Sequence, residues 1–345
     1  MPNVGRRWVD PYGVPVTMYG AGPGRVNDHR YGAGVVWTLL RGRRKFDLIY
    51  FLMAGVQVAY GVPLARALGI PSVMKFSGSN DLGDALRSVI GPMEIAGIRK
   101  WCEKTMILNE AMVDEAVNAG FDRSQLLWMP NPVDTDQYRP VTSGEKLRLR
   151  TQLGIPPDVP VVVFVGRLAP EKELPSLVSA FGLAAANHAS VRLVIVGDGV
   201  MRADLEQQVD SLGIRDRVTF AGMQKPEQIC HWLQASDIFA LVSHREGLPV
   251  SLIEAMAIAL PSVVTDIPAN TQLVQDGQHG YHAKVRDAES IASGILRLCN
   301  DPEARQRFGR NARPIAVERF SIDRVLDTYE DLFGSIMERR VSAAL

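Results

Sequence analysis

The sequence predicts an α/β protein built from two doubly wound domains, and three observations support this. The chain has 345 residues, more than one hydrophobic core usually serves. Short β-branched runs alternate with helix-length amphipathic segments, as in parallel sheets covered by helices. A proline-rich stretch over about 130–160 interrupts this alternation. We therefore predict an N-terminal domain over 1–140, a C-terminal domain over 141–318, and a last helix over 319–345 that crosses back to the first domain.

We expect the strands of the first half at apolar runs that are flanked by polar or glycine-containing segments. These runs are Val14–Met18, Phe46–Leu52, Ser72–Phe76, Thr105–Leu108 and Leu126–Met129. Helical periodicity between them predicts helices over Val56–Leu68 and, after a capping Asn109, over Glu110–Ala119.

The second half repeats the rhythm more clearly. The expected strands are Val161–Val165, Arg192–Val196, Val218–Phe220, Ile238–Leu241 and Ser262–Thr265. Helices are expected near 173–187, 201–212, 226–235 and 250–259, and the tail over Ser321–Met337 reads as one more amphipathic helix. Alternating strands and helices of this kind are typical of Rossmann-like domains.

Composition argues against several classes of protein. Lys+Arg and Asp+Glu are both 38, so the net charge is zero and nothing global indicates a nucleic-acid partner. The cysteines Cys102, Cys230 and Cys299 are far apart, which suits a reducing cytoplasm better than a disulfide framework. No apolar run approaches the roughly 18 residues of a membrane span, and the start has no signal-peptide core. We expect a cytoplasmic protein.

The first 45 residues are markedly basic, and Arg41-Gly-Arg-Arg-Lys45 concentrates this charge. Such a cluster could contact anionic lipid at the inner membrane face, or a phosphorylated acceptor. A solvated helix end is the simpler interpretation. Peripheral membrane contact therefore stays an open expectation.

Loops that follow strands of the second half carry the residues suited to chemistry, because open α/β sheets bind ligands beyond the carboxyl ends of their strands. After the first strand come Gly166 and the cations Arg167 and Lys172, at the start of a new helix. Together they suit a diphosphate. Alternatively, Arg167 pairs with a carboxylate such as Glu171. Gly197-Asp-Gly199 forms another tight loop, for which turn chemistry is the simpler explanation.

Two carboxylates eight positions apart form the strongest feature. Glu246 lies in a Gly/Pro loop and Glu254 inside the following helix, among apolar neighbours where an unpaired carboxylate is costly. A carboxylate can accept hydrogen bonds from two adjacent hydroxyls, so Glu254 would suit a ribose diol and Glu246 a hexose. A loop charge and a half-exposed helix residue are the alternatives.

Several motifs in order carry a resemblance to a known family. They are Asn131-Pro-Val-Asp134, Phe164-Val-Gly-Arg-Leu-Ala-Pro-Glu-Lys172, Ile195-Val-Gly-Asp-Gly199, Phe220-Ala-Gly222, Glu246-Gly-Leu-Pro-Val-Ser-Leu-Ile-Glu254-Ala-Met256 and Asp276-Gly277…Gly280. This order resembles glycosyltransferase family 4, the group 1 transferases. The resemblance implies the GT-B fold, in which two Rossmann-like domains face each other across a cleft. It also implies transfer of a sugar with retention and without a metal or other cofactor.

The resemblance also implies roles for individual residues. Arg167 and Lys172 would hold the donor diphosphate, Glu246 the transferred sugar and Glu254 the ribose. The donor would further contact main-chain positions or side chains at Gly166, Gly197, Met223, Gly247, Leu248 and Val250. The Asp134-Thr-Asp136 pattern matches a metal motif of a different glycosyltransferase fold but here continues the first motif, so we expect no metal there.

Two departures from the family pattern concern the first domain. A His-Gly pair common in the family is replaced by Met74-Lys-Phe-Ser-Gly78, so we expect Lys75, Ser77 and Asn80 on the acceptor side. The opening strand, double-glycine loop and helix of the family are missing, and the run Gly20–Gly24 is no convincing substitute. We therefore expect an incomplete first domain.

Together these features predict a retaining hexosyltransferase that moves a sugar from a nucleotide-diphosphate donor to a hydroxyl acceptor, a sugar or a lipid-linked molecule. Glycan or glycolipid synthesis is the expected context. The alternative is a non-catalytic donor-binding subunit or a truncated relic of such an enzyme, because the second half carries the motifs and the first does not.

Overall fold

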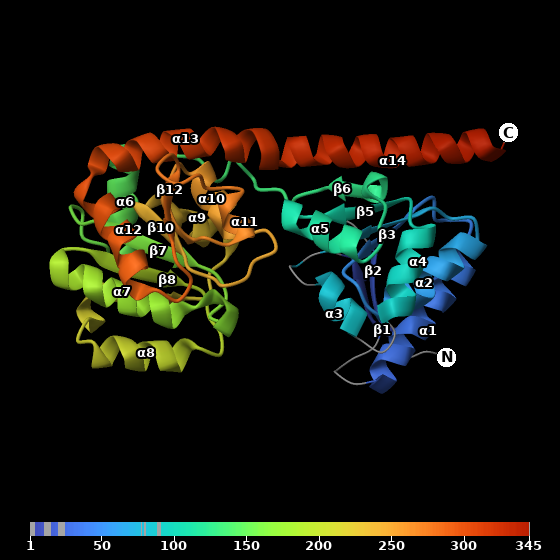
Figure 1. The fold of residues 1–345 in the computed structure, drawn as a ribbon, viewed down its shortest axis with the longest axis horizontal. Helices are drawn as coiled ribbons and strands as arrows, with labels where there is room; N and C mark the ends of the chain where they lie inside the picture. The colour runs from blue at the N-terminus through green and yellow to red at the C-terminus, as the bar shows by residue number, and fades with distance from the viewer. Residues whose placement is uncertain are drawn as a thin grey trace. The chain divides into compact units, whose positions relative to one another are not determined.

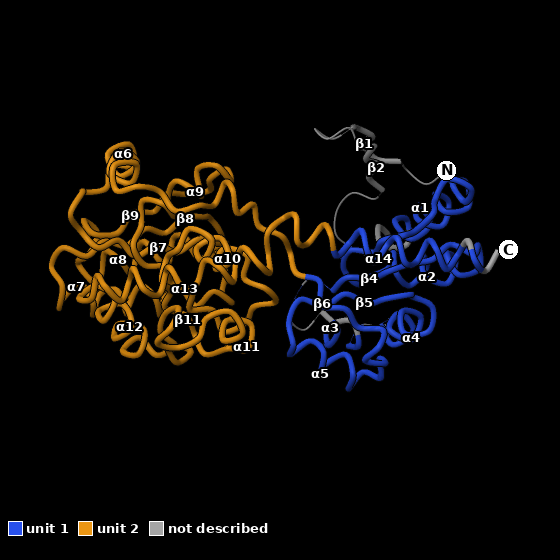
Figure 2. Tube along the Cα trace, turned by 90° about the horizontal axis from the view of Figure 1, so that it is seen from above, with its two compact units in different colours: residues 1–129, 328–345 blue, residues 130–327 orange. Residues whose placement is uncertain are grey.

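The computed structural model describes residues 4–9, 15–19, 25–76, 78, 81–87 and 91–344. The chain divides into two compact units, which are coloured separately in Figure 2. Unit 1 combines Met1–Met129 with Thr328–Leu345, and unit 2 is Pro130–Asp327. The glycine run over 20–24 lies outside the described residues.

Unit 1 contains a parallel four-stranded sheet, in the order β3 (Ile49–Leu52), β4 (Ser72–Lys75), β5 (Lys104–Ile107) and β6 (Leu126–Trp128) (Figure 1). Its connections are helical: α2 (Val56–Ala67), α3 (Asp81–Arg87), α4 (Gly91–Trp101) and α5 (Glu110–Asn118). The predicted cap is present, since the Asn109 side chain accepts from the main-chain N–H of Met112 at 2.9 Å. The parallel order and the helical connections confirm an α/β unit.

The beginning of the chain differs from the expected arrangement. The run expected as a first strand becomes β2 (Pro15–Tyr19), but it pairs antiparallel with β1 (Val4–Val9) in a separate two-stranded sheet. Helix α1 (Arg25–Gly42), which the sequence did not indicate, packs on α2. A Cβ at Gly32 would lie 2.6 Å from the Tyr60 ring, so the glycine that weakens the helical signal is needed for this packing.

Unit 2 contains a parallel six-stranded sheet. Its order is β12 (Gly280–Ala283), β11 (Ser262–Thr265), β10 (Ile238–Leu241), β7 (Val161–Val165), β8 (Arg192–Val196) and β9 (Val218–Gly222). Helices α7 (Leu174–Asn187), α8 (Arg202–Ser211), α9 (Pro226–Gln234), α10 (Val250–Ala257), α12 (Ala288–Asn300) and α13 (Pro302–Phe320) cover it. Helix α7 packs beside α12, and α10 against α13 (Figure 1). The strand order reverses between β7 and β10, which is the topological switch point where such sheets bind ligands.

A helix interrupts the stretch that was expected to be an irregular junction. Helix α6 (Ser143–Leu153) begins with a capping box between Thr142 and Glu145. It is tied to the sheet by Asp237, whose carboxylate pairs with Lys146 at 2.7 Å and Arg150 at 2.6 Å. The prolines around α6 hide it in the sequence, because proline is read as a breaker even where it only flanks a helix.

The last helix, α14 (Ile322–Ala344), ends within unit 1. The Tyr329 hydroxyl lies 2.8 Å from the hydroxyl of Tyr50 and receives a hydrogen bond from Lys75 Nζ at 3.2 Å. Phe333 packs edge-on against Tyr50. Over the described residues, no helix combines the length and apolar character needed to cross a bilayer.

Candidate functional site

Three neighbouring strands of unit 2 end in glycines that pack main chain against main chain. Gly166 follows β7, Gly197 follows β8 and Gly222 ends β9. The N–H of Gly166 donates to Val196 at 3.0 Å, and that of Gly197 donates to Gly222 at 2.8 Å. Gly197 has φ 133°, and a Cβ there would lie 1.9 Å from the Gly166 carbonyl oxygen. No side chain fits at Gly197, so this edge presents bare backbone, as close approach of a ligand requires.

Lys172 and Glu246 meet at the switch point. Lys172 lies after β7 and Glu246 after β10, and these strands are adjacent in the sheet. Lys172 Nζ lies 2.6 Å from Glu246 Oε1, with the two side chains only 18% and 9% exposed. The Ser243 hydroxyl donates to the same oxygen at 2.6 Å. The fold therefore joins two of the predicted residues in one sheltered ion pair.

Arg167 adopts the alternative arrangement that the sequence left open. Its guanidinium pairs with Glu171 at 2.8 Å and is 73% exposed. Exposed ion pairs of this kind contribute about 0–1 kcal/mol. An entering anion can therefore displace Glu171 at low cost.

The start of α10 is a positive helix end without a cap of its own. Its N-cap is Pro249, no side chain caps it, and no acidic residue occupies its first turn, which begins at Val250. Gly247 and the buried Leu248 lead into it. Uncapped main-chain N–H groups and the helix dipole together favour an anion at this position.

Glu254 lies on α10 in a poorly hydrated environment. Burial raises the pKa of its carboxyl to about 7, and a hydrogen bond with the Tyr138 side chain opposes the rise only in part. The Tyr138 pKa is raised as well, first by burial and then by the Glu254 charge. The sequence did not indicate Tyr138, although it lies just after the Asn131–Asp134 motif. A carboxyl that is costly to ionise within the protein gains from hydroxyl donors that a ligand brings.

Two apolar side chains are exposed beside the glycine edge, as we call Gly166, Gly197 and Gly222 at the ends of the three strands. Met223 follows β9 and is 81% exposed, and Val200 follows Gly199 and is 82% exposed. Arg202 stacks on the Phe220 ring at 4.6 Å from its centroid. Val200 is a second candidate that the sequence did not single out, because its loop looked like simple turn chemistry.

Of the predicted acceptor-side residues, Lys75 ends β4 in unit 1 and is 4% exposed. Ser77 and Asn80 lie outside the described residues. Asp134 organises its own turn by accepting from the main chain of Asp136 and Gln137 at 3.1 and 2.9 Å. Over the described ranges, no three His, Cys, Asp or Glu side chains gather as a metal site would require.

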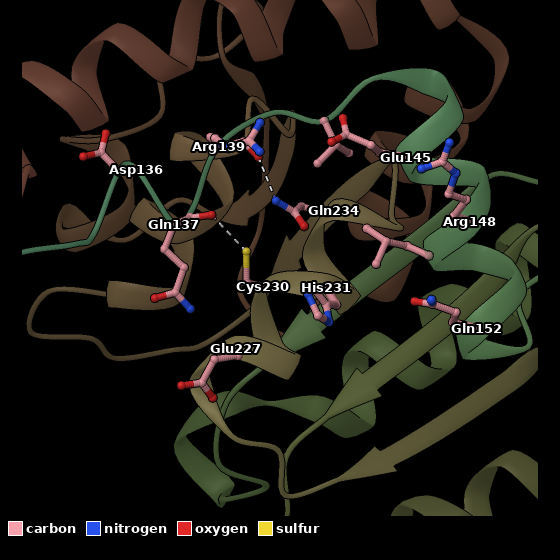
Figure 3. A pocket seen from close by; sticks show the side chains of 12 residues that line it. Asp136, Gln137, Arg139, Glu145, Arg148, Gln152, Glu227, Cys230, His231 and Gln234 are labelled. Atoms are coloured by element: carbon pink, nitrogen blue, oxygen red, sulfur yellow. Dashed lines mark hydrogen bonds between the residues drawn. The ribbon is translucent and has the colours of Figure 1, made fainter.

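A polar hollow of about 540 Å³ opens elsewhere in unit 2, between α6, α9 and the 136–141 segment (Figure 3). Two hydrogen bonds shape it, from Cys230 Sγ to Gln137 at 3.2 Å and from Gln234 to Arg139 at 3.0 Å. None of the predicted site residues is part of its lining. The strand-end site is therefore distinct from this hollow.

Comparison with known proteins places these features in context. Residues 145–314 match the family of group 1 glycosyl transferases. An α-D-kanosaminyltransferase of Streptomyces kanamyceticus is 27% identical over 292 residues, 82% of this chain and 75% of that protein. The putative glycosyltransferase EpsD of Bacillus subtilis is 30% identical over 206 residues, 60% of this chain but only 53% of EpsD. The family match includes all the motifs identified above except Asn131-Pro-Val-Asp134.

Solved structures extend the similarity to the whole fold. HepE of Anabaena in complex with UDP superposes with a TM-score of 0.80 at 21% identity, covering 94% of this chain and 87% of that one. The same protein has also been solved with UDP-glucose. At 21% sequence identity, structural similarity is evidence for the fold alone. It confirms the GT-B fold that the motif order implied.

Proposed function

Through residues 145–314 the chain belongs to the group 1 glycosyl transferases, and from this premise we propose that it transfers a hexose, with retention, from a nucleotide-diphosphate donor to a hydroxyl acceptor. The observation that carries the proposal is the sheltered Lys172–Glu246 pair at the switch point of unit 2. A cation and an anion held there suit a donor whose diphosphate is negative and whose sugar offers hydroxyls. Synthesis of a glycan or glycolipid is the context we propose.

The donor diphosphate is assigned to Lys172, Arg167 and the start of α10. The N–H groups around Gly247, Leu248 and Val250 add the positive end of a helix that has no acidic residue in its first turn. Negative charge grows on the diphosphate as the glycosidic bond breaks. Cationic groups already in place stabilise that charge more than they stabilise the intact donor.

The sugar and nucleoside are assigned to the two carboxylates and the glycine edge. Glu246 would accept from sugar hydroxyls and Glu254 from the ribose diol. Gly166 and Gly197 would let the donor approach the main chain, and the exposed Met223 would cover the base. In the same-face reaction that we propose, the acceptor oxygen bonds to the anomeric carbon on the side from which the diphosphate departs. A donor phosphate oxygen takes up the acceptor proton as the bond from the sugar to the diphosphate breaks.

The experiment is a transfer assay with uridine donors, because a structurally similar protein has been solved with UDP and UDP-glucose. Binding of UDP is measured by calorimetry, and release of UDP from UDP-hexoses is measured across a panel of sugar and lipid-linked acceptors. The anomeric configuration of the product is read by NMR. Binding with no release for any pair would favour the alternative, a non-catalytic donor-binding subunit, and an inverted product would contradict retention.

Transfer is expected to need no metal ion. Arg167, Lys172 and the helix start supply the positive charge that a divalent cation would otherwise bring. Turnover measured in EDTA should therefore equal turnover in buffer. Loss of activity in EDTA that manganese or magnesium restores would contradict this and direct attention to Asp134 and Asp136.

We further propose that unit 1 contacts membranes through a basic end face, formed by exposed cations of the loop after α1 together with the end of α14. Arg340 joins the two by donating to the Asp47 carbonyl at 2.8 Å. A hollow of about 290 Å³ beside it contains Arg66 and Arg339 next to Trp101. The cations are Arg41, in the last turn of α1, and Arg43, Arg44 and Lys45 of the loop after it, all exposed.

Vesicle binding tests this face. Each basic side chain near an anionic bilayer contributes about 1 kcal/mol. Replacing Arg43, Arg44 and Lys45 by alanine should therefore lower partitioning onto phosphatidylserine-containing vesicles more than tenfold, measured by co-sedimentation. A triple alanine variant at Arg148, Arg307 and Arg310 of unit 2, all exposed, is the matched control and should bind like the wild type. Equal loss in both variants, or no binding by the wild type, would contradict the proposal.

A further inference from the structure

Two residues of unit 2 adopt a left-handed backbone that glycine usually occupies, and their side chains pair with each other. Glu173 has φ 50° and Arg286 has φ 61°. Such conformations cost free energy for a residue with a Cβ and persist where the surroundings enforce them. Glu173 occupies the N-cap position of α7, and Arg286 directly precedes the N-cap of α12, which packs beside α7 (Figure 1). Both residues of this side-chain pair therefore have a strained backbone conformation.

A single carboxylate oxygen is the centre of this contact. Glu173 Oε1 accepts from Arg286 Nη2 at 2.6 Å and Nε at 2.8 Å, and it lies 2.8 Å from His244 Nδ1. The Glu173 side chain is 13% exposed, whereas that of Arg286 is 64% exposed. The hydrogen bonds, with that from Arg286 first, hold the Glu173 pKa below its usual range. We call Glu173, His244 and Arg286 the Glu173 clasp.

The clasp joins three loops that follow β7, β10 and β12. Glu173 is the neighbour of Lys172, and His244 lies two residues before Glu246. The main-chain N–H of His244 also donates to the carbonyl of Glu171 at 3.1 Å. The clasp therefore lies next to the Lys172–Glu246 pair and connects the same two loops by independent contacts.

Stability alone does not account for this arrangement. Ion pairs with an exposed partner add little to folding, while two left-handed residues subtract from it. Glycine at either position would remove the strain together with the pair. What the clasp adds, through His244, is a fixed relation between the loop that carries Lys172 and the loop that carries Glu246.

We propose that the Glu173 clasp positions Lys172 and Glu246 for the donor. Its three members are positioning residues, since they act on the donor through those two side chains. The proposal rests on the proposed function for its kinetic consequences. The loop order that it describes can be measured without any activity.

Glu173→Gly is the sharpest variant, because glycine accepts φ 50° without strain but removes the carboxylate. Misplacing reactive groups by about 1 Å can cost about 100-fold in rate. We expect kcat to fall 10- to 100-fold, the Kd for UDP to change less than threefold, and the melting temperature to stay level or rise. Arg286→Gly should act alike, and the double variant should be no worse than either single one. Glu173→Gln keeps an acceptor for Arg286 and should recover part of the rate.

Ala259→Gly is the matched control, since Ala259 has φ 66° at the end of α10 and lies outside the clasp. It should relieve the same kind of strain with kcat unchanged. Unchanged kcat in Glu173→Gly, or a fall in melting temperature without any change in kcat, would make the pair merely structural and overturn the proposal.

Hydrogen exchange separates this proposal from the proposed function. In Glu173→Gly, the peptide that contains His244 should exchange at least tenfold faster than in the wild type, whether or not transfer is observed. Ala259→Gly should leave that peptide unchanged. Absence of transfer in the wild type with faster exchange in the variant would reject the function and keep the clasp. Unchanged exchange would reject the clasp.

Discussion

Replacing Lys172 by methionine is expected to lower kcat about 100- to 1000-fold, the cost of removing one preorganised group that faces developing charge. Lys172 is the sheltered cation of the site, and its ammonium lies 2.6 Å from Glu246. Binding of the free nucleoside should change little, because the charge acts at the diphosphate. Lys172→Arg should retain part of the rate. Adding Arg167→Ala should deepen the loss, measured as initial rates of UDP release.

The change also leaves the sheltered Glu246 carboxylate without its counter-charge, so a fall in stability could imitate a loss of chemistry. Lys172→Met combined with Glu246→Gln removes both charges and should restore the melting temperature. Turnover should remain low, because both side chains are assigned to the donor. Recovery of turnover in this double variant would show that the pair serves folding alone. Arg310→Ala, an exposed change on α13, is the control for loss of one cation.

Replacing Glu254 by alanine is expected to weaken UDP binding at least tenfold. A hydrogen bond to a charged group contributes about 1.5–3 kcal/mol, and 1.4 kcal/mol corresponds to tenfold in affinity. Calorimetry with UDP measures the effect, and uridine, which keeps the ribose, should lose affinity in proportion. Unchanged affinity for both ligands would contradict the ribose assignment.

The pKa of about 7 for Glu254 adds a pH signature to the same assignment. The ionised form accepts two hydroxyl hydrogens, whereas the protonated form offers one of its oxygens as a donor. UDP affinity should therefore fall as the pH is lowered through 7, and Glu254→Gln should remove this dependence. The raised pKa has the opposite effect on folding, since its contribution to stability is present below pH 4.5 and is lost as the pH rises through 7. As the pH falls through 7, UDP should therefore bind more weakly while the folded state becomes more stable. The loss of affinity is then not a consequence of unfolding.

Much of this protein could be predicted from local patterns. Short apolar runs predicted the strands β7, β8, β10 and β11 at their observed bounds, and a glycine directly follows the first two. The sequence placed Gly166 and Gly197 in tight loops directly after β7 and β8, and in the structure Gly197 lies against the main chain of Gly166. Such features depend on neighbours along the chain, namely side-chain periodicity and the conformational freedom of single residues. They can therefore be predicted from the amino-acid sequence alone.

Features that depend on sheet order were decided only by the tertiary structure. Lys172 and Glu246 are 74 positions apart, and they meet because β7 and β10 are adjacent although two strands separate them in sequence. Tyr138 meets Glu254, and Arg286 meets Glu173, over even longer separations of 116 and 113 positions along the chain. Helix α6 was not predicted because prolines flank it, and in the structure its Arg150 pairs with Asp237. Local sequence determines which residues are available for chemistry, whereas the pairing of strands determines which of them share a site, because the free energy of that pairing comes from burial across the whole sheet.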